Sequence, residues 1–162
     1  MNIQEVIQAL FQFSDRIFTK EAPADRVDIE KFEERYGLKL PQDYIELLLV
    51  TNGCSLMGST VYGVGASATD SLDELYIFEH TAVENEMYDY LVPFSPDGFG
   101  NHYCFDTRSH GDRSCLVVFW QHDYEYTAED VPEITHDSFA GWVKTVMIGW
   151  TLEAYDHEGN RR

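Results

Sequence analysis

The sequence predicts an α+β domain with helices at both ends and an antiparallel β-meander between them. Three observations support this. The first third carries apolar residues at helical spacing, the middle carries β-branched and aromatic runs separated by turn residues, and the last part returns to helical spacing. A chain of 162 residues fits one domain, which we expect to span residues 1–162.

The N-terminal helices are indicated by their apolar spacing and by the residues at their ends. Residues 2–14 repeat apolar side chains every three to four positions. A second helix is expected to have Asp28 as its N-cap and Gly37 as its C-terminal glycine. Pro41 suits the first turn of a third helix, which we expect to end at the Asn52-Gly53 turn.

The middle of the chain predicts a short β segment in "STVYGVG", one more helix and three consecutive antiparallel strands. Ser71 and Glu74 form a capping-box signature, which favours a helix in "SLDELYIFEHTAVENEMY". The strands are predicted in "YLVPF", "NHYCFD" and "SCLVVFWQHD", with turn residues in "SPDGFG" and "TRSHGDR" between them. From Asp137, a candidate N-cap, apolar residues including two tryptophans repeat at helical spacing, and we expect this closing helix to pack on the sheet.

The charge of the chain is strongly negative and unevenly distributed. There are 29 Asp and Glu against 11 Lys and Arg, a net charge of −18, and only Arg108 and Arg113 are cationic between residues 40 and 143. A surface built from this stretch repels nucleic acid and anionic membranes and attracts basic partners. The charge could equally serve solubility alone, so the sequence leaves both interpretations open.

The cysteines, the N-terminus and the length of the apolar runs indicate where in the cell the protein is expected. The three cysteines are odd in number and have no CxxC spacing, which is typical of a reducing compartment. The N-terminus has no basic segment followed by a cleavage site, and no apolar run is long enough to span a membrane. We therefore expect a cytoplasmic protein.

The stretch "FSPDGFGNHYCFD" is the densest in chemically active residues. It lacks the third glycine and the following helix of a dinucleotide loop, and Asp97 is followed directly by Gly98, unlike a calcium loop. Alternation along a strand would place His102, Cys104 and Asp106 on one face, with His110 and His122 nearby. These residues leave open a small-molecule or metal-dependent enzyme that uses His102, Cys104 and His122.

Two blocks of sequence carry a resemblance to a known family. The first, "IEKFEERYGLKLPQDYIELLLVTNG", and the second, "FSPDGFGNHYCFDTRSHGDRSCLVVFWQHDYE", together with "DSFAGWV", resemble the SUKH superfamily, or Smi/Knr-type domain. The resemblance covers residues 29–143 and leaves 1–24 as an accessory helix and connector. The matching signature residues are Glu30, Phe32, Gly37, Leu40, Pro41, Tyr44, Asn52, Gly53, Gly98, Gly100, Asp106, Trp120 and Phe139.

The resemblance implies a domain without a recognised catalytic centre, so we expect no catalytic residue, metal or cofactor. Many bacterial members are immunity proteins that neutralise a toxin, often a nuclease, whereas fungal members are scaffolding regulators of cell-wall synthesis. An acidic surface suits a basic toxin. We predict that the partner contacts loops 66–90 and 122–133 and the strand ends, through Asp70, Asp73, Glu74, Glu84, Glu86, Tyr88, Asp89, Asp97, Phe99, Asn101, Asp123, Tyr124, Glu125 and Tyr126.

Overall fold

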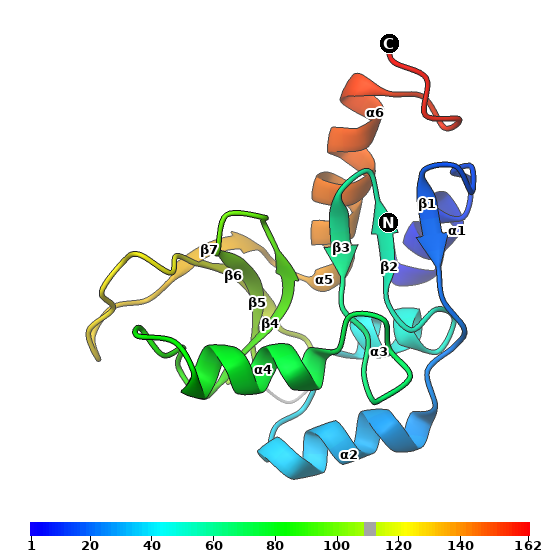
Figure 1. Cartoon of the computed structure of the whole chain (residues 1–162). Helices are drawn as coiled ribbons and strands as arrows, with labels where there is room; N and C mark the ends of the chain where they lie inside the picture. The colour runs from blue at the N-terminus through cyan, green and yellow to red at the C-terminus, as the bar shows by residue number, and fades with distance from the viewer. Residues whose placement is uncertain (109–112) are drawn as a thin grey trace.

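The computed structural model contains two antiparallel sheets flanked by helices (Figure 1) and describes residues 1–108 and 113–162. The larger sheet has the strand order β4-β5-β6-β7. Its strands are β4 (Leu91–Pro96), β5 (His102–Asp106), β6 (Leu116–Trp120) and β7 (Glu133–His136). The α+β prediction is confirmed, as are the three consecutive strands β4 to β6. The turn predicted in "TRSHGDR" falls partly outside the described residues.

The C-terminal helix packs on one face of this sheet, as predicted. It begins as α5 (Phe139–Trp142), continues as a π-helical stretch η1 (Val143–Gly149) and ends as α6 (Trp150–Ala154). Aromatic rings fill the interface: Phe94 stacks on Phe105 with ring centroids 4.1 Å apart and meets Trp142 edge-on at 4.9 Å. The predicted cap at Asp137 is wrong by one residue, because the Ser138 side chain accepts the hydrogen bond from Gly141 N–H.

The three N-terminal helices are confirmed, with one corrected end. They are α1 (Ile3–Leu10), α2 (Arg26–Tyr36) and α3 (Gln42–Leu48). The α2 helix is capped by Asp25, whose carboxylate accepts from Val27 N–H, so the predicted cap Asp28 lies inside the first turn. Gly37 ends α2 in the left-handed conformation at φ 64°, as expected for a C-terminal glycine.

The second sheet was predicted only in part: the short β segment expected in "STVYGVG" is confirmed as the strand Ser59–Val61, but its pairing into a sheet was not expected. This sheet consists of β1 (Phe18–Lys20), β2 (Cys54–Leu56) and β3 (Ser59–Val61), and β1 pairs with β2 across more than thirty residues of sequence. Each strand has three residues, too few to show an alternating pattern. Part of the expected polar connector is therefore a strand.

The predicted middle helix is confirmed as α4 (Leu72–Thr81), which lies below the larger sheet in Figure 1. Its N-cap is Ser71, but the Ser71 side chain makes no capping hydrogen bond, so the capping box itself is not formed. Within residues 1–108 and 113–162, no helix is long and apolar enough to cross a membrane.

Several signature residues hold the elements together through buried hydrogen bonds. The Tyr44 hydroxyl donates to the Tyr62 carbonyl at 2.5 Å, which ties α3 to the end of β3. The Asn52 side chain bonds both backbone groups of Val64, accepting from N–H at 2.8 Å and donating to C=O at 2.9 Å. The buried carboxylate of Glu33 accepts from Leu40 N–H at 2.8 Å and from the Arg113 guanidinium.

The Asn52-Gly53 turn gives a stability prediction with a matched control. Gly53 and Gly58 both have φ +90°, but a Cβ on Gly53 would lie 2.8 Å from the Val61 carbonyl oxygen, whereas nothing lies within 4 Å of one on Gly58. We expect Gly58→Ala to lower the free energy of unfolding by about 1 kcal/mol and Gly53→Ala by about 3 kcal/mol, measured by urea denaturation. Equal losses would show that the close approach is unimportant.

Candidate functional site

The second face of the larger sheet is covered by α4, through the Glu79–His102 contact, and by the loops that follow α4 and β6. Leu91, Cys104, Val118 and Trp120 form a small apolar cluster on this face. The segment after α4 covers it with Met87, and the loop after β6 covers it with Tyr126, whose ring stacks on Trp120 with centroids 4.0 Å apart. The two loops that we expected to bind a partner are therefore anchored in a common apolar cluster.

These two loops also bond each other directly. The Asn85 side-chain amide donates to the His122 carbonyl at 3.0 Å, and the Tyr88 hydroxyl donates to the carbonyls of Thr127 and Asp130. Segments 82–90 and 121–130 thus form one continuous surface, which we call the tyrosine–acid surface. Its predicted partner-binding residues are Glu84, Glu86, Tyr88, Asp89, Asp123, Tyr124, Glu125 and Tyr126.

The charge of the tyrosine–acid surface is not neutralised by nearby cations. The Arg108 guanidinium is held by both carboxylate oxygens of Asp106, at 3.0 and 2.7 Å, and lies 4.0 Å from the ring centroid of Tyr90. Arg113 is bound to Glu33. Among the described residues, the carboxylates of Glu84, Glu86 and the other acids of this surface form no ion pair. They are therefore available to a basic partner.

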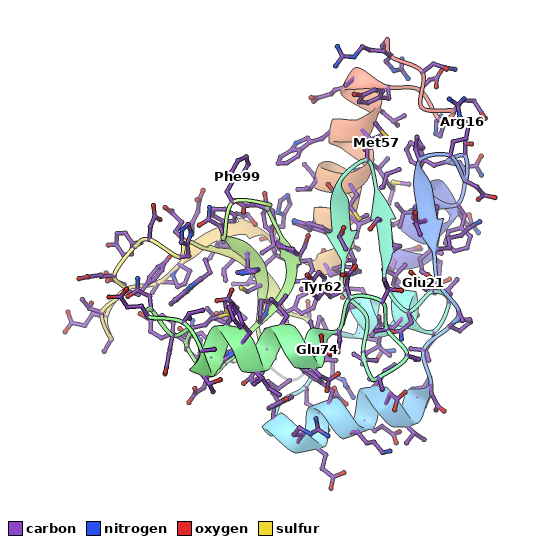
Figure 2. The ribbon with its side chains drawn as sticks, viewed as in Figure 1. Arg16, Glu21, Met57, Tyr62, Glu74 and Phe99 are labelled. Carbon is purple, nitrogen blue, oxygen red and sulfur yellow. The ribbon has the colours of Figure 1, made fainter. Side chains whose placement is uncertain are left out.

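The turn between β4 and β5 stands next to this surface. Asp97 accepts hydrogen bonds from Phe99 N–H at 2.7 Å and from the backbone and side-chain N–H groups of Asn101. Burial acts to raise the pKa of Asp97, but these hydrogen bonds outweigh it and hold the pKa below its ordinary value. The turn presents Phe99 with 81% of its surface exposed (Figure 2).

The same turn is fixed to the loop after β6. Asn101 Oδ1 accepts from the backbone N–H of His122 at 3.1 Å and from His122 Nδ1 at 2.8 Å. Gly98 and Gly100 adopt φ 88° and 93°, and a Cβ on Gly100 would lie 2.9 Å from the His122 ring. The prediction that this stretch is a hairpin turn is confirmed.

Three of the predicted partner-binding residues lie elsewhere. Asp70, Asp73 and Glu74 are at the N-terminal end of α4, whereas the tyrosine–acid surface lies beyond its C-terminal end (Figure 1). Asp73 is engaged there by Gly65 N–H at 2.9 Å and by Arg35 at 3.7 Å. The predicted partner-binding residues therefore lie at both ends of α4 and do not form a single group.

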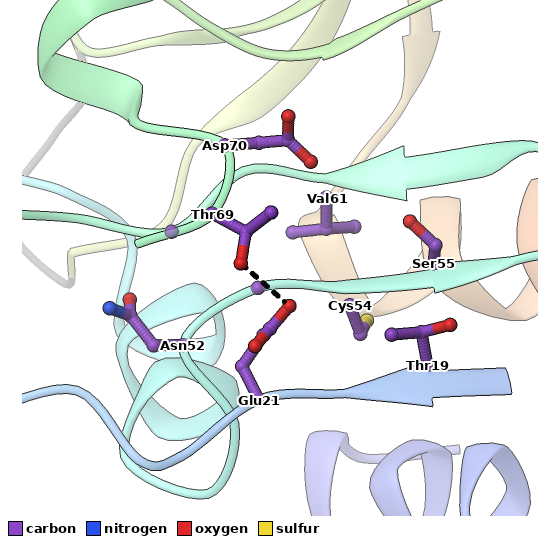
Figure 3. A pocket seen from close by; sticks show the side chains of 10 residues that line it. Thr19, Glu21, Asn52, Cys54, Ser55, Val61, Thr69 and Asp70 are labelled. Carbon is purple, nitrogen blue, oxygen red and sulfur yellow. Dashed lines mark hydrogen bonds between the residues drawn. The ribbon is translucent and has the colours of Figure 1, made fainter. Parts of the chain in front are cut away.

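A small cavity lies behind Asp70, between the sheet β1-β2-β3 and the segment before α4 (Figure 3). Its volume is about 20 Å³, and the Thr69 hydroxyl closes one side by donating to Glu21 at 3.0 Å. A space of this size holds about one water molecule. Burial raises the pKa of the Cys54 thiol, which lines the cavity, to about 12, so this thiol stays protonated and unreactive.

His102 and Cys104, from the alternative enzyme site, lie on one face of the larger sheet, where both make buried structural contacts. His102 Nε2 donates to Glu79 on α4 at 2.5 Å, and Cys104 Sγ lies 3.7 Å from Met87 Sδ. Asp106 binds Arg108, and His122 lies in an exposed turn; His110 is outside the described residues. In the described part of the chain, no three His, Cys, Asp or Glu side chains are grouped so as to hold a metal ion.

The reactivity of Cys104 is also suppressed. Complete burial, and to a lesser extent the nearby Glu79 carboxylate, raise the pKa of the Cys104 thiol well above its ordinary value. The thiolate, which is the nucleophilic form, is therefore disfavoured. Nothing in this arrangement favours the alternative of an enzyme built on His102 and Cys104.

Sequence reasoning missed Glu79, the partner of His102. The signal was present, because Leu72, Tyr76 and Glu79 share the buried face of α4. A carboxylate in line with apolar residues on a helix predicts a buried partner, since an unpaired buried charge is costly. The side chains of Glu79 and His102 are only 9% and 6% exposed.

The two antiparallel sheets and the closing helix define an α+β domain, on which the tyrosine–acid surface is formed by two loops. The sequence profile of the SMI1 / KNR4 family (SUKH-1) matches residues 23–145, and the chain belongs to that family. The resemblance drawn from the sequence is confirmed.

A crystal structure of a protein from Pseudomonas syringae pv. tomato has the same fold. The alignment has a TM-score of 0.64 and covers 90% of this chain and 98% of the other, at 18% identity. At this identity the likeness establishes the fold alone. Comparison with curated proteins gave no significant match.

The buried Glu79–His102 pair gives a second prediction. Glu79→Ala leaves the buried His102 nitrogen without its acceptor, so we expect the free energy of unfolding to fall by about 3 kcal/mol. The control is Asp15→Ala, which breaks the exposed pair with Lys20 and should have little effect in the same urea titration. Similar losses in the two variants would contradict a structural role for the buried pair.

Proposed function

We propose that this protein is a cytoplasmic, immunity-type binding module that neutralises a toxin with a basic surface. Membership of the SMI1 / KNR4 family (SUKH-1) is consistent with a protein-binding role of this kind. The proposed contact region is the tyrosine–acid surface, with the adjoining turn at Asp97, Phe99 and Asn101. The proposal involves no catalytic residue and no cofactor.

The observation that carries the proposal is the joining of segments 82–90 and 121–130. Both are rich in acids and lie more than thirty residues apart in sequence. They are held together by the hydrogen bonds of Asn85 and Tyr88 and by the Tyr88 ring, which meets Tyr126 edge-on with centroids 6.1 Å apart. Aromatic residues on a fixed frame lose little conformational entropy on binding and are enriched at interface centres. Tyr124 is 48% exposed and Phe99 81% exposed, so both can serve as anchors.

Binding on this surface would proceed in two physical stages. The unneutralised carboxylates attract a basic partner and raise the association rate, an effect that weakens with added salt. The exposed rings then exclude water at the contact and slow dissociation. Inhibition follows when the basic groove that a nuclease uses for its substrate is covered.

The test is co-expression with a toxin encoded beside this gene, followed by binding kinetics on the purified pair. We expect co-expression to abolish killing. The triple variant Glu84→Gln/Glu86→Gln/Asp123→Asn should associate about tenfold more slowly and show a weaker salt dependence. None of these three side chains makes an ion pair in the described structure, so the variant should retain its stability.

The matched control removes the same charge from the opposite end of the molecule. Asp15→Asn/Glu153→Gln/Glu158→Gln alters exposed acids near α6 and the C-terminus (Figure 1). This control should associate at close to the unmodified rate. Undiminished killing, or equal slowing in the two triple variants, would count against the proposed surface.

A further inference from the structure

A second feature of the surface is a hollow at the N-terminal end of α4. Its volume is about 330 Å³, and in Figure 2 Tyr62 and Glu74 lie close together beside it, between β3 and α4. We call it the α4 hollow. Its lining residues are Tyr62, Thr69, Asp70, Ser71, Glu74, Leu75 and Phe78.

The α4 hollow combines apolar walls with an acidic rim. Phe78 is 54% exposed there, and Leu75 and the Tyr62 ring are partly exposed beside it. Asp70 and Glu74 are exposed acids, and no Lys or Arg occurs among the described residues that line the hollow. Apolar walls with acids at one edge suit a side chain that has an aliphatic stem and a cationic end.

A neighbouring hollow, which shares Ser71 and Glu74 with the α4 hollow, contains two cations. Lys31 and Arg35 line the neighbouring hollow with Asp73, and Arg35 is 3.7 Å from the Asp73 carboxylate. Tyr62 and Asp70 line the same hollow, and burial followed by the negative charge of Asp70 raises the pKa of the Tyr62 hydroxyl above its ordinary value. The negative field of Asp70 therefore acts inside the hollow.

The backbone around the hollow is fixed before any partner binds. Tyr62 N–H donates to the Phe94 carbonyl at 2.9 Å, and the Tyr62 carbonyl accepts from the Tyr44 hydroxyl. Gly63 N–H donates to the Asp70 carbonyl at 2.9 Å, which joins the segment carrying Tyr62 to the segment carrying Asp70. A preorganised site loses less entropy on binding.

The chain shows elsewhere how it holds a guanidinium. Arg108 lies over the Tyr90 ring and is bound by both oxygens of Asp106. Tyr62 and Asp70 repeat this combination of a tyrosine and an aspartate, with Glu74 as a second acid. Guanidinium suits such a site better than ammonium, because its planar fork stacks on rings and bonds carboxylates at two points.

We propose that the α4 hollow binds an arginine side chain of the protein partner. The guanidinium would bond Asp70 and Glu74 and lie against Tyr62, while the stem packs on Leu75 and Phe78. Because the arginine would belong to a protein partner, this proposal rests on the proposed protein-binding function.

The experiment uses a probe that needs no toxin. The full chain, labelled with ¹⁵N, is titrated with N-acetyl-L-arginine amide, and amide shifts are followed by NMR. We expect saturable shifts concentrated at residues 62–78, at least threefold weaker binding of the lysine analogue, and no saturable shifts with the neutral citrulline analogue.

Two matched variants test the site. Asp70→Asn/Glu74→Gln should weaken arginine binding about tenfold, whereas Glu84→Gln/Glu86→Gln, which removes the same charge from the tyrosine–acid surface, should leave it unchanged. Shifts spread over all acidic segments, equal binding of lysine, or equal weakening in both variants would overturn the inference. These results do not depend on toxin neutralisation, so the failure of either proposal can be recognised separately.

Discussion

The arrangement of the loops depends on the buried pair between Glu79 and His102. This contact joins the last turn of α4 to β5 at 2.5 Å. Because α4 is fixed there, the chain that follows it places Met87 against Cys104 and Tyr88 against the loop after β6. The tyrosine–acid surface is thus built outward from one interaction in the interior. Glu33 plays a comparable part on the other side, where its carboxylate binds Leu40 N–H and Arg113.

The excess of acidic residues has both a cost in stability and an effect on the charge of the surface. Crowded like charges destabilise a compact chain, and the aromatic interior around Phe94, Phe105 and Trp142 offsets that repulsion. Arg108 and Arg113, the two arginines between residues 40 and 143, form ion pairs with Asp106 and Glu33. They therefore do not neutralise the acids of the tyrosine–acid surface. The acidic face next to fixed tyrosines is the feature on which the proposed binding of a basic partner depends.

Local signals in the sequence were sufficient for most of the fold. Helical spacing located α1, α2, α3 and the closing helix, the Ser71 and Glu74 signature indicated α4, and turn residues separated β4, β5 and β6. The strands β1, β2 and β7 could not be predicted, since three or four residues show too little alternation and β1 depends on a partner far along the chain. The acidic loops and their tyrosines were predicted as a partner-binding surface, and that role stays a prediction. Their contacts, the separate position of Asp70 and Glu74, and the pairing of His102 with Glu79 needed the tertiary structure, because none of them is encoded in local spacing.

The most direct measurement is a hydrogen-exchange footprint of the protein bound to its toxin. We expect slower amide exchange in the complex at residues 84–89 and 121–130, and at the proposed α4 hollow in residues 62–78, with little change in α1 and α6. Unbound protein treated identically provides the reference, and the Glu84→Gln/Glu86→Gln/Asp123→Asn variant should show the same footprint at a higher toxin concentration. Protection confined to α1, α6 or the sheet β1-β2-β3 would contradict the assignment of the tyrosine–acid surface.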